Sequence, residues 1–197
     1  MTTRITWISS GATAATHRAA FGSDEGLESK AREQALPLTA QIGSADRIFC
    51  SPDLAARQTA DALGVTAAPD PALGEIDFGR WKTRTLLEIE ATEPAALVTW
   101  VNDPAAAPHG GESIAACCER IGFWLERETQ RPGRVLVVGP ANCIRAAVLH
   151  CLQAPLTAFR RLDIAPLSFT SLSFNGGQWR VQATGCRFKQ ASPDIAG

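Results

Sequence analysis

The chain has 197 residues, of which 45% are hydrophobic and 20% are charged, a composition that excludes collagen-like and disordered classes. Nineteen basic and twenty acidic residues leave a formal charge of −1, so nothing favours a nucleic-acid partner. Apolar runs such as 135–138 are too short for a membrane span, and the first ten residues lack a signal-peptide core. We expect one cytoplasmic domain over residues 1–190, followed by a loose tail at 191–197.

The first part of the chain predicts strands that alternate with helices. Pro37 can kink the first long helix, and Ser51 fits a helix N-cap with Pro52 at the first helical position. Residues 70–110 hold four prolines and two short helical patterns, at 85–90 and 94–102, and are interpreted as an insertion packed over the sheet. The expected strands before it are 3–9, 47–50 and 65–67, and the expected helices are 25–42 and 52–63.

The remainder of the chain continues the alternation and ends in a hairpin. An Asn175-Gly176-Gly177 turn separates two alternating runs, which is typical of a β-hairpin. Strands that alternate with helices predict a three-layer α/β/α sandwich with a mostly parallel sheet. The expected helices here are 112–129, 140–152 and 155–162, and the expected strands are 134–138, 167–174 and 178–184.

The cysteines are interpreted as free thiols of a cytoplasmic protein. No C-x-x-C pair and no metal-ligand spacing is present, and a chain of this length does not need disulfides to fold. We therefore expect no metal site. The six cysteines are Cys50, Cys117, Cys118, Cys143, Cys151 and Cys186.

Three polar loops follow predicted strands. In open α/β sheets, ligands bind beyond the carboxyl ends of the strands, and helix N-termini at such places can hold an anion. The loops cover residues 9–13, 50–52 and 139–142. The sequence therefore predicts one binding site that these three loops share.

Six segments in register resemble the motifs of one known family, and they cover nearly the whole chain in that family's order. ISSGAT at 8–13 stands where the family has VRHGET, and GGES at 110–113 matches its helix start. The other four are LESKAREQA at 27–35, SPDLAARQTA at 51–60, LGEIDFGRW at 73–81 and VLVVGPANCIR at 135–145. Together they resemble the histidine phosphatase superfamily with its phosphoglycerate mutase-like fold.

The same resemblance implies that the family's phosphate chemistry is missing. That chemistry uses two histidines, one of them the nucleophile, and two arginines that neutralise the transferring phosphoryl group. The four matching positions here are Ser9, Ser10, Ala55 and Pro140. Glu75 occupies the family's proton-donor position, but a carboxyl acid replaces neither a nucleophile nor lost positive charge. The family's core chemistry implies no cofactor.

We therefore expect a catalytically degenerate member, a binding or regulatory pseudoenzyme with a small-molecule ligand. A first alternative is an active phosphomonoester hydrolase rebuilt around Ser10, Glu75 and either His109 or His17. A second alternative is a structural partner in a complex, and either a homodimer or a hetero-complex is compatible with the sequence. The candidate ligand-binding residues are Ser10, Gly11, Thr13, Ser51, Glu75, His109 and Asn142.

Overall fold

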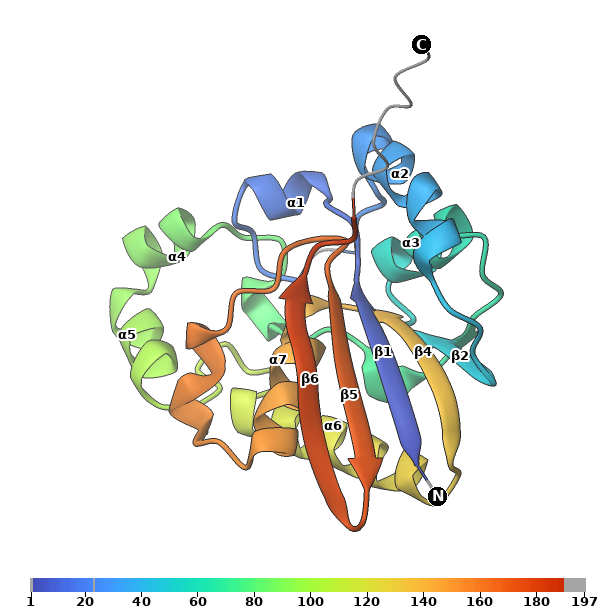
Figure 1. The fold of residues 1–197 in the computed structure, drawn as a ribbon. Coiled ribbons are helices and arrows are strands. Elements are labelled where there is room, and N and C mark those ends of the chain that lie inside the picture. The colour runs from blue at the N-terminus through green and yellow to red at the C-terminus, as the bar shows by residue number, and fades with distance from the viewer. Residues whose placement is uncertain (1, 23, 190–197) are drawn as a thin grey trace.

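A computed structural model describes residues 2–22 and 24–189, which form one six-stranded sheet flanked by helices (Figure 1). The α/β sandwich expected from the alternation is therefore confirmed. In spatial order the strands are β3 (Ala68–Pro69), β2 (Arg47–Cys50), β4 (Gly133–Gly139), β1 (Thr3–Ser9), β5 (Phe169–Asn175) and β6 (Gln178–Cys186).

Parallel pairing brings the ends of three strands to one edge of the sheet. β1 pairs in parallel with β4, and Ser9 lies opposite Gly139 at the carboxyl ends of both. β2 also pairs in parallel with β4, so Cys50 ends beside Val138. Only β5 runs the other way, since it is antiparallel to both β1 and β6. The three predicted loops therefore leave the sheet side by side, at the top of Figure 1.

The two faces of the sheet bury separate cores because successive side chains of a strand point to opposite faces. Ile5 and Trp7 of β1 belong to the core under α6 and α7, which lie behind the sheet in Figure 1. Ile8 belongs to the core under α2, α3 and η1. Four buried residues in a row, 135–138, supply both cores and make β4 the centre of the sandwich.

Among the described residues, none of the helices combines the length and the apolar content that crossing a bilayer would require. The α-helices are α1 (Ala14–His17), α2 (Ser29–Ala35), α3 (Leu54–Ala62), α4 (Leu86–Thr92), α5 (Pro94–Asn102), α6 (Ile114–Thr129) and α7 (Ala141–Leu152). Short 3-10 helices are η1 (Leu36–Gln41), η2 (Pro71–Leu73), η3 (Gly79–Trp81) and η4 (Leu156–Arg161).

Several sequence predictions need correction. The helix expected over 25–42 is α2 followed by the 3-10 turn η1, because Pro37 lacks the N–H that an α-helix needs. The helix expected from Pro52 begins at Leu54, because the Ser51 N–H pairs with Val138 and continues the sheet. The third strand is Ala68–Pro69 and not 65–67, and the helix expected at 155–162 is the 3-10 helix η4. The predicted tail at 191–197 lies outside the described residues.

Residues 70–110 pack beside the sheet through an aromatic cluster. Phe21 contacts the rings of Phe78, Trp81 and Trp100 at centroid distances of 5.1, 5.5 and 5.2 Å. A bridge between Ala20 and Thr85 ties the segment to the loop after β1. α4 and α5 are thereby held on the side of the molecule away from α2 and α3 (Figure 1).

Candidate functional site

A pocket of about 300 Å³ lies where β1 and β4 end and where α3 and α7 begin. This is the edge that the strand-end rule predicts for a ligand. The pocket brings together Ser9, Ser10, Gly11, Thr13, Ala55, Glu75 and Pro140. It also contains Asp53 and Arg145. Asp53 was not among the site residues predicted from the sequence.

Backbone hydrogen bonds hold the loop after β1 in place. The Ser9 N–H donates to Ser168 O and the Ser10 N–H donates to Gly139 O, both at 2.9 Å. The Gly11 N–H donates to Thr59 Oγ1 at 3.0 Å. A Cβ at Gly11 would come within 2.9 Å of the Leu27 side chain, so glycine permits this close approach. Ser10 thus lines the pocket from a loop that these hydrogen bonds hold in place.

Glu75 is held in the pocket wall from several sides. Its N–H donates to Asp53 Oδ2 at 2.9 Å, and its Oε1 accepts from the Ile76 N–H at 2.8 Å and from Asn142 Nδ2 at 2.9 Å. The preceding carbonyl, of Gly74, accepts from Arg120 Nη1 at 3.1 Å. Burial raises the pKa of the Glu75 carboxyl, and the hydrogen bonds from Asn142 and Ile76 offset this only in part.

A second pocket, of about 350 Å³, lies on the other side of Glu75 and Arg145, since both residues line both pockets. Asn142 lines only this second pocket. Arg145 lies one turn into α7, where its Nη1 donates to Asn142 Oδ1 and its Nε donates to Leu162 O, each at 2.8 Å. Arg145 forms no salt bridge with an aspartate or glutamate of the described residues. The two pockets form adjoining parts of one site.

Three residues predicted for the site, Ser51, His109 and His17, lie outside both of its pockets. Ser51 is fully buried, and its hydroxyl is bonded to the Asp53 carboxylate. His109 is 1% exposed between the Phe78 and Trp81 rings, and its Nδ1 accepts the Gly111 N–H at 3.1 Å. Burial lowers the pKa of His109, which keeps its imidazole neutral. Neither Ser51 nor His109 lines either pocket of the site.

His17 is also absent from the site. It is exposed on α1 and its Nε2 contacts Glu28 Oε2 at 3.0 Å. The lining of the pocket around Ser10 contains no histidine at all among the described residues. The structure therefore places neither histidine of the rebuilt-site alternative beside Ser10 and Glu75, because His109 is packed in the aromatic cluster and His17 faces solvent.

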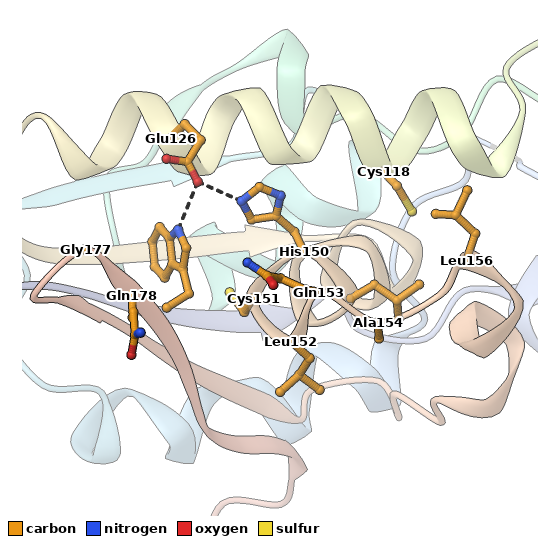
Figure 2. Close-up of a pocket in the computed structure, with 12 residues that line it drawn as sticks. Cys118, Glu126, His150, Cys151, Leu152, Gln153, Ala154, Leu156, Gly177 and Gln178 are labelled. Atoms are coloured by element: carbon orange, nitrogen blue, oxygen red, sulfur yellow. Dashed lines mark hydrogen bonds and ion pairs between the residues drawn. The ribbon is translucent and has the colours of Figure 1, made fainter.

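A larger pocket, of about 740 Å³, lies away from this site, at the far end of α7 beside the β5–β6 turn (Figure 2). A helix of twelve residues places its ends about 18 Å apart. Within this pocket, Glu126 Oε1 already accepts from His150 Nε2 at 2.8 Å and from Trp179 Nε1 at 3.2 Å. Its polar groups thus pair with one another, and size alone does not make it the functional site.

The pockets offer no cluster of ligands for a metal. Across residues 2–22 and 24–189, no group of three or more histidine, cysteine, aspartate or glutamate side chains gathers in a way that could hold a metal ion. All six cysteines are free thiols. Burial raises the pKa of Cys118 and of Cys151 to about 12, so both thiols are protonated at neutral pH.

The raised pKa of Glu75 leads to a prediction for stability. The folded protein favours the protonated carboxyl, so stability is lost as the pH rises through the raised pKa. Glu75→Gln mimics the protonated form and keeps an oxygen acceptor. We expect the variant to unfold at a higher temperature than the wild type at pH 8, and the difference to shrink towards pH 4. Thermal unfolding followed by circular dichroism measures this difference.

The matched control for that prediction is Glu33→Gln, on the exposed side of α2. Glu33 makes no side-chain hydrogen bond to the described residues, so its substitution removes one carboxylate without touching a pocket. A melting difference for Glu75→Gln that stays the same from pH 4 to pH 8, or that favours the wild type at pH 8, contradicts the role assigned to burial.

Comparison with known proteins shows which family this chain belongs to. A family model of the histidine phosphatase superfamily (branch 1) matches residues 10–187. The glucosyl-3-phosphoglycerate phosphatase of Mycolicibacterium vanbaalenii is 35% identical over 103 residues, which cover 49% of this chain and 46% of that protein. Phosphoserine phosphatase 1 of Hydrogenobacter thermophilus is 26% identical over 135 residues, or 65% and 64% of the two chains. The chain thus spans less than two thirds of the length of these curated relatives.

Solved structures show the same fold over most of the chain. A mycobacterial glucosyl-3-phosphoglycerate phosphatase in complex with VO3 superposes with a TM-score of 0.83 at 25% identity, and the match covers 93% of this chain and 99% of that one. A phosphoserine phosphatase variant from Entamoeba histolytica in complex with phosphoserine gives a TM-score of 0.83 at 21% identity, over 93% and 96% of the chains. The chain belongs to the histidine phosphatase superfamily.

Proposed function

We propose that this chain is a binding member of its superfamily that does not transfer phosphate. The observation that supports this is the lining of the pocket around Ser10. Among the described residues it contains two carboxylates, Asp53 and Glu75, one guanidinium, Arg145, and no histidine. The residues at the family's four phosphate-handling positions are two serines, an alanine and a proline.

Chemistry and electrostatics both oppose phosphoryl transfer in such a pocket. Serine is a weak nucleophile unless a base or a metal activates it, and no histidine lies beside Ser10. A phosphate ester at neutral pH carries close to two negative charges. Asp53 and an ionised Glu75 would repel it, and the single Arg145 cannot neutralise all three groups. The loss of even one stabilising donor typically costs about 100-fold to 1000-fold in rate.

The proposal includes a small-molecule ligand in the adjoining pockets and a location in the cytoplasm. Six thiols with no disulfide suit a reducing compartment. A purely structural role in a complex is the second candidate, and it would leave both pockets without a ligand. The relatives named as phosphatases are the reason to test turnover before either of these roles.

The deciding experiment is the turnover of an aryl phosphate by the purified protein from pH 5 to 8. We expect a rate equal to that of buffer for the wild type, for Ser10→Ala and for Glu75→Ala. Both side chains line the pocket, so a rebuilt mechanism would depend on at least one of them. Turnover by the wild type that either substitution abolishes would refute the binding role and identify an active hydrolase.

A further inference from the structure

Two arginines without a carboxylate partner face the second pocket. Arg145 and Arg160 both line it, and neither lies within 4 Å of an aspartate or glutamate oxygen among the described residues. By contrast, each of the four arginines at 80, 84, 120 and 127 is paired with a carboxylate. The pocket thus holds two guanidinium groups that form no ion pair with the described residues, although Glu75 and Asp163 act on the charge of Arg145 from more than 4 Å away.

Both guanidinium groups are held in position while keeping donors free. Arg160 lies 3.6 Å above the Trp100 ring, and its Nη2 donates to Trp100 O at 2.6 Å. Its Nε and Nη1 have no hydrogen-bond partner among the described residues. Arg145 uses its Nε and Nη1 on Leu162 and Asn142, which leaves its Nη2 unused. Stacking and hydrogen bonding fix an arginine fork in advance, so little entropy is lost when it binds an anion.

The two charges are close enough to repel each other. Arg145 lowers the pKa of Arg160 through charge repulsion, in addition to the larger effect of burial on Arg160. An anion between the two side chains would relieve that repulsion and gain charge-assisted hydrogen bonds. Glu75 borders the same pocket, and its ionised carboxylate would oppose an anion there, but burial raises the pKa of this carboxyl and so favours the uncharged form.

The remaining walls of this pocket are largely aromatic. Phe21, Phe78, Trp100 and Phe159 line it. Phe21 and Phe78 pack edge to face with Trp100, which holds these rings in place. Aromatic walls favour a ligand with an apolar or ring-shaped body. The pocket of about 350 Å³ has room for a small molecule of that kind.

We propose that the second pocket binds a small organic anion, whose charged group lies between Arg145 and Arg160 and whose apolar body packs against Phe21 and Phe78. The charged group is a carboxylate or a phosphate ester, which an arginine fork recognises by the same geometry. This inference names the ligand class for the binding role proposed above and rests on it. The proposed anion site therefore lies in the second pocket and not in the pocket around Ser10.

The test is titration calorimetry with three probes that share one ring: benzoate, phenyl phosphate and the uncharged benzamide. We expect at least one of the two anions to bind at millimolar or lower concentration, and benzamide to bind at least about tenfold more weakly. Arg160→Gln should weaken binding of the anion about tenfold to a hundredfold, because it removes one charged donor pair. Binding of benzoate alone selects a carboxylate ligand, and binding of phenyl phosphate alone selects a phosphate ester.

The matched control is Arg161→Gln, which removes the same charge from the neighbouring residue of η4. Arg161 is exposed, lines neither pocket and makes no side-chain hydrogen bond to the described residues. Its substitution should leave anion binding unchanged. The inference is overturned if neither anion binds, if benzamide binds as tightly as the anions, or if the two glutamine variants behave alike.

The failure of the binding role would look different. Hydrolysis of phenyl phosphate by the protein, lost in Ser10→Ala, would refute the non-catalytic role. The proposed anion site would still be supported in that case if benzoate binding depended on Arg160. If the protein neither hydrolyses phenyl phosphate nor binds an anion, the anion site in the second pocket is refuted and the non-catalytic role is not. A thermal unfolding temperature of Arg160→Gln close to that of the wild type would show that the variant is folded.

Discussion

Gly111→Ala is expected to lower the free energy of unfolding by about 3 kcal/mol, because it forces two backbone segments apart. A Cβ at Gly111 would lie 2.1 Å from Asp77 O and 2.7 Å from the Gly79 N. The two segments are also joined by the Glu112 N–H, which donates to Asp77 O at 2.7 Å, and by the Arg80 N–H, which donates to His109 O at 3.1 Å. Backbone atoms cannot move aside as the end of a flexible side chain can.

The measurement is thermal or urea unfolding, where a loss of about 3 kcal/mol corresponds to roughly 6–12 °C for a domain of this size. Gly43→Ala is the matched control. Nothing lies within 4 Å of a Cβ at Gly43, and its φ is not in the left-handed region, so this variant should be neutral or slightly more stable. A melting temperature of Gly111→Ala within a degree or two of the wild type would show that the two segments are not locked together.

Trp7→Ala is the second change with a large expected effect. Trp7 is fully buried at the centre of β1 and packs against the Trp124 ring at 5.8 Å. Truncation of a buried tryptophan to alanine costs about 3–5 kcal/mol, a large share of the total stability of an ordinary domain. Trp7 also supports the site, because a Cβ at Gly139 would lie 3.2 Å from its Nε1. The end of β4 rests on this ring.

Trp7→Phe separates packing from hydrogen bonding. The Trp7 Nε1 is buried without a hydrogen-bond partner among the described residues, so its removal relieves an unsatisfied donor. We expect Trp7→Phe to cost less than half as much as Trp7→Ala in urea unfolding. Equal losses for the two variants would mean that the indole N–H has a partner, such as an ordered water molecule, and that its bond contributes to stability.

The framework of the fold could be predicted because it depends on local patterns. Alternating or continuous apolar runs marked the strands β1, β2, β4, β5 and β6 to within a few residues. The glycines at 176 and 177 adopt φ values of 61° and 76°, which only glycine takes up easily, so the hairpin was visible in the sequence. The errors came where a long-range bond overrides a local preference, as at Ser51, whose N–H pairs with Val138.

The candidate site was predictable only in part. Motif order placed Ser10, Gly11, Thr13 and Glu75 together, because the ends of neighbouring parallel strands meet at one edge. Nothing in the local sequence separates His109 from a site residue. Its ring turns into the aromatic cluster instead, because Phe78 and Trp81 bury it.

The sequence by itself therefore determined which side chains leave the carboxyl ends of the strands. Only the tertiary structure decided which positively charged side chains line a pocket together. Arg145 and Arg160 are fifteen positions apart, on a helix and on a later 3-10 turn, yet both line one pocket with Trp100 of a third segment. Such a juxtaposition follows from the packing of η4 and α5 beside α7, and no local pattern encodes it.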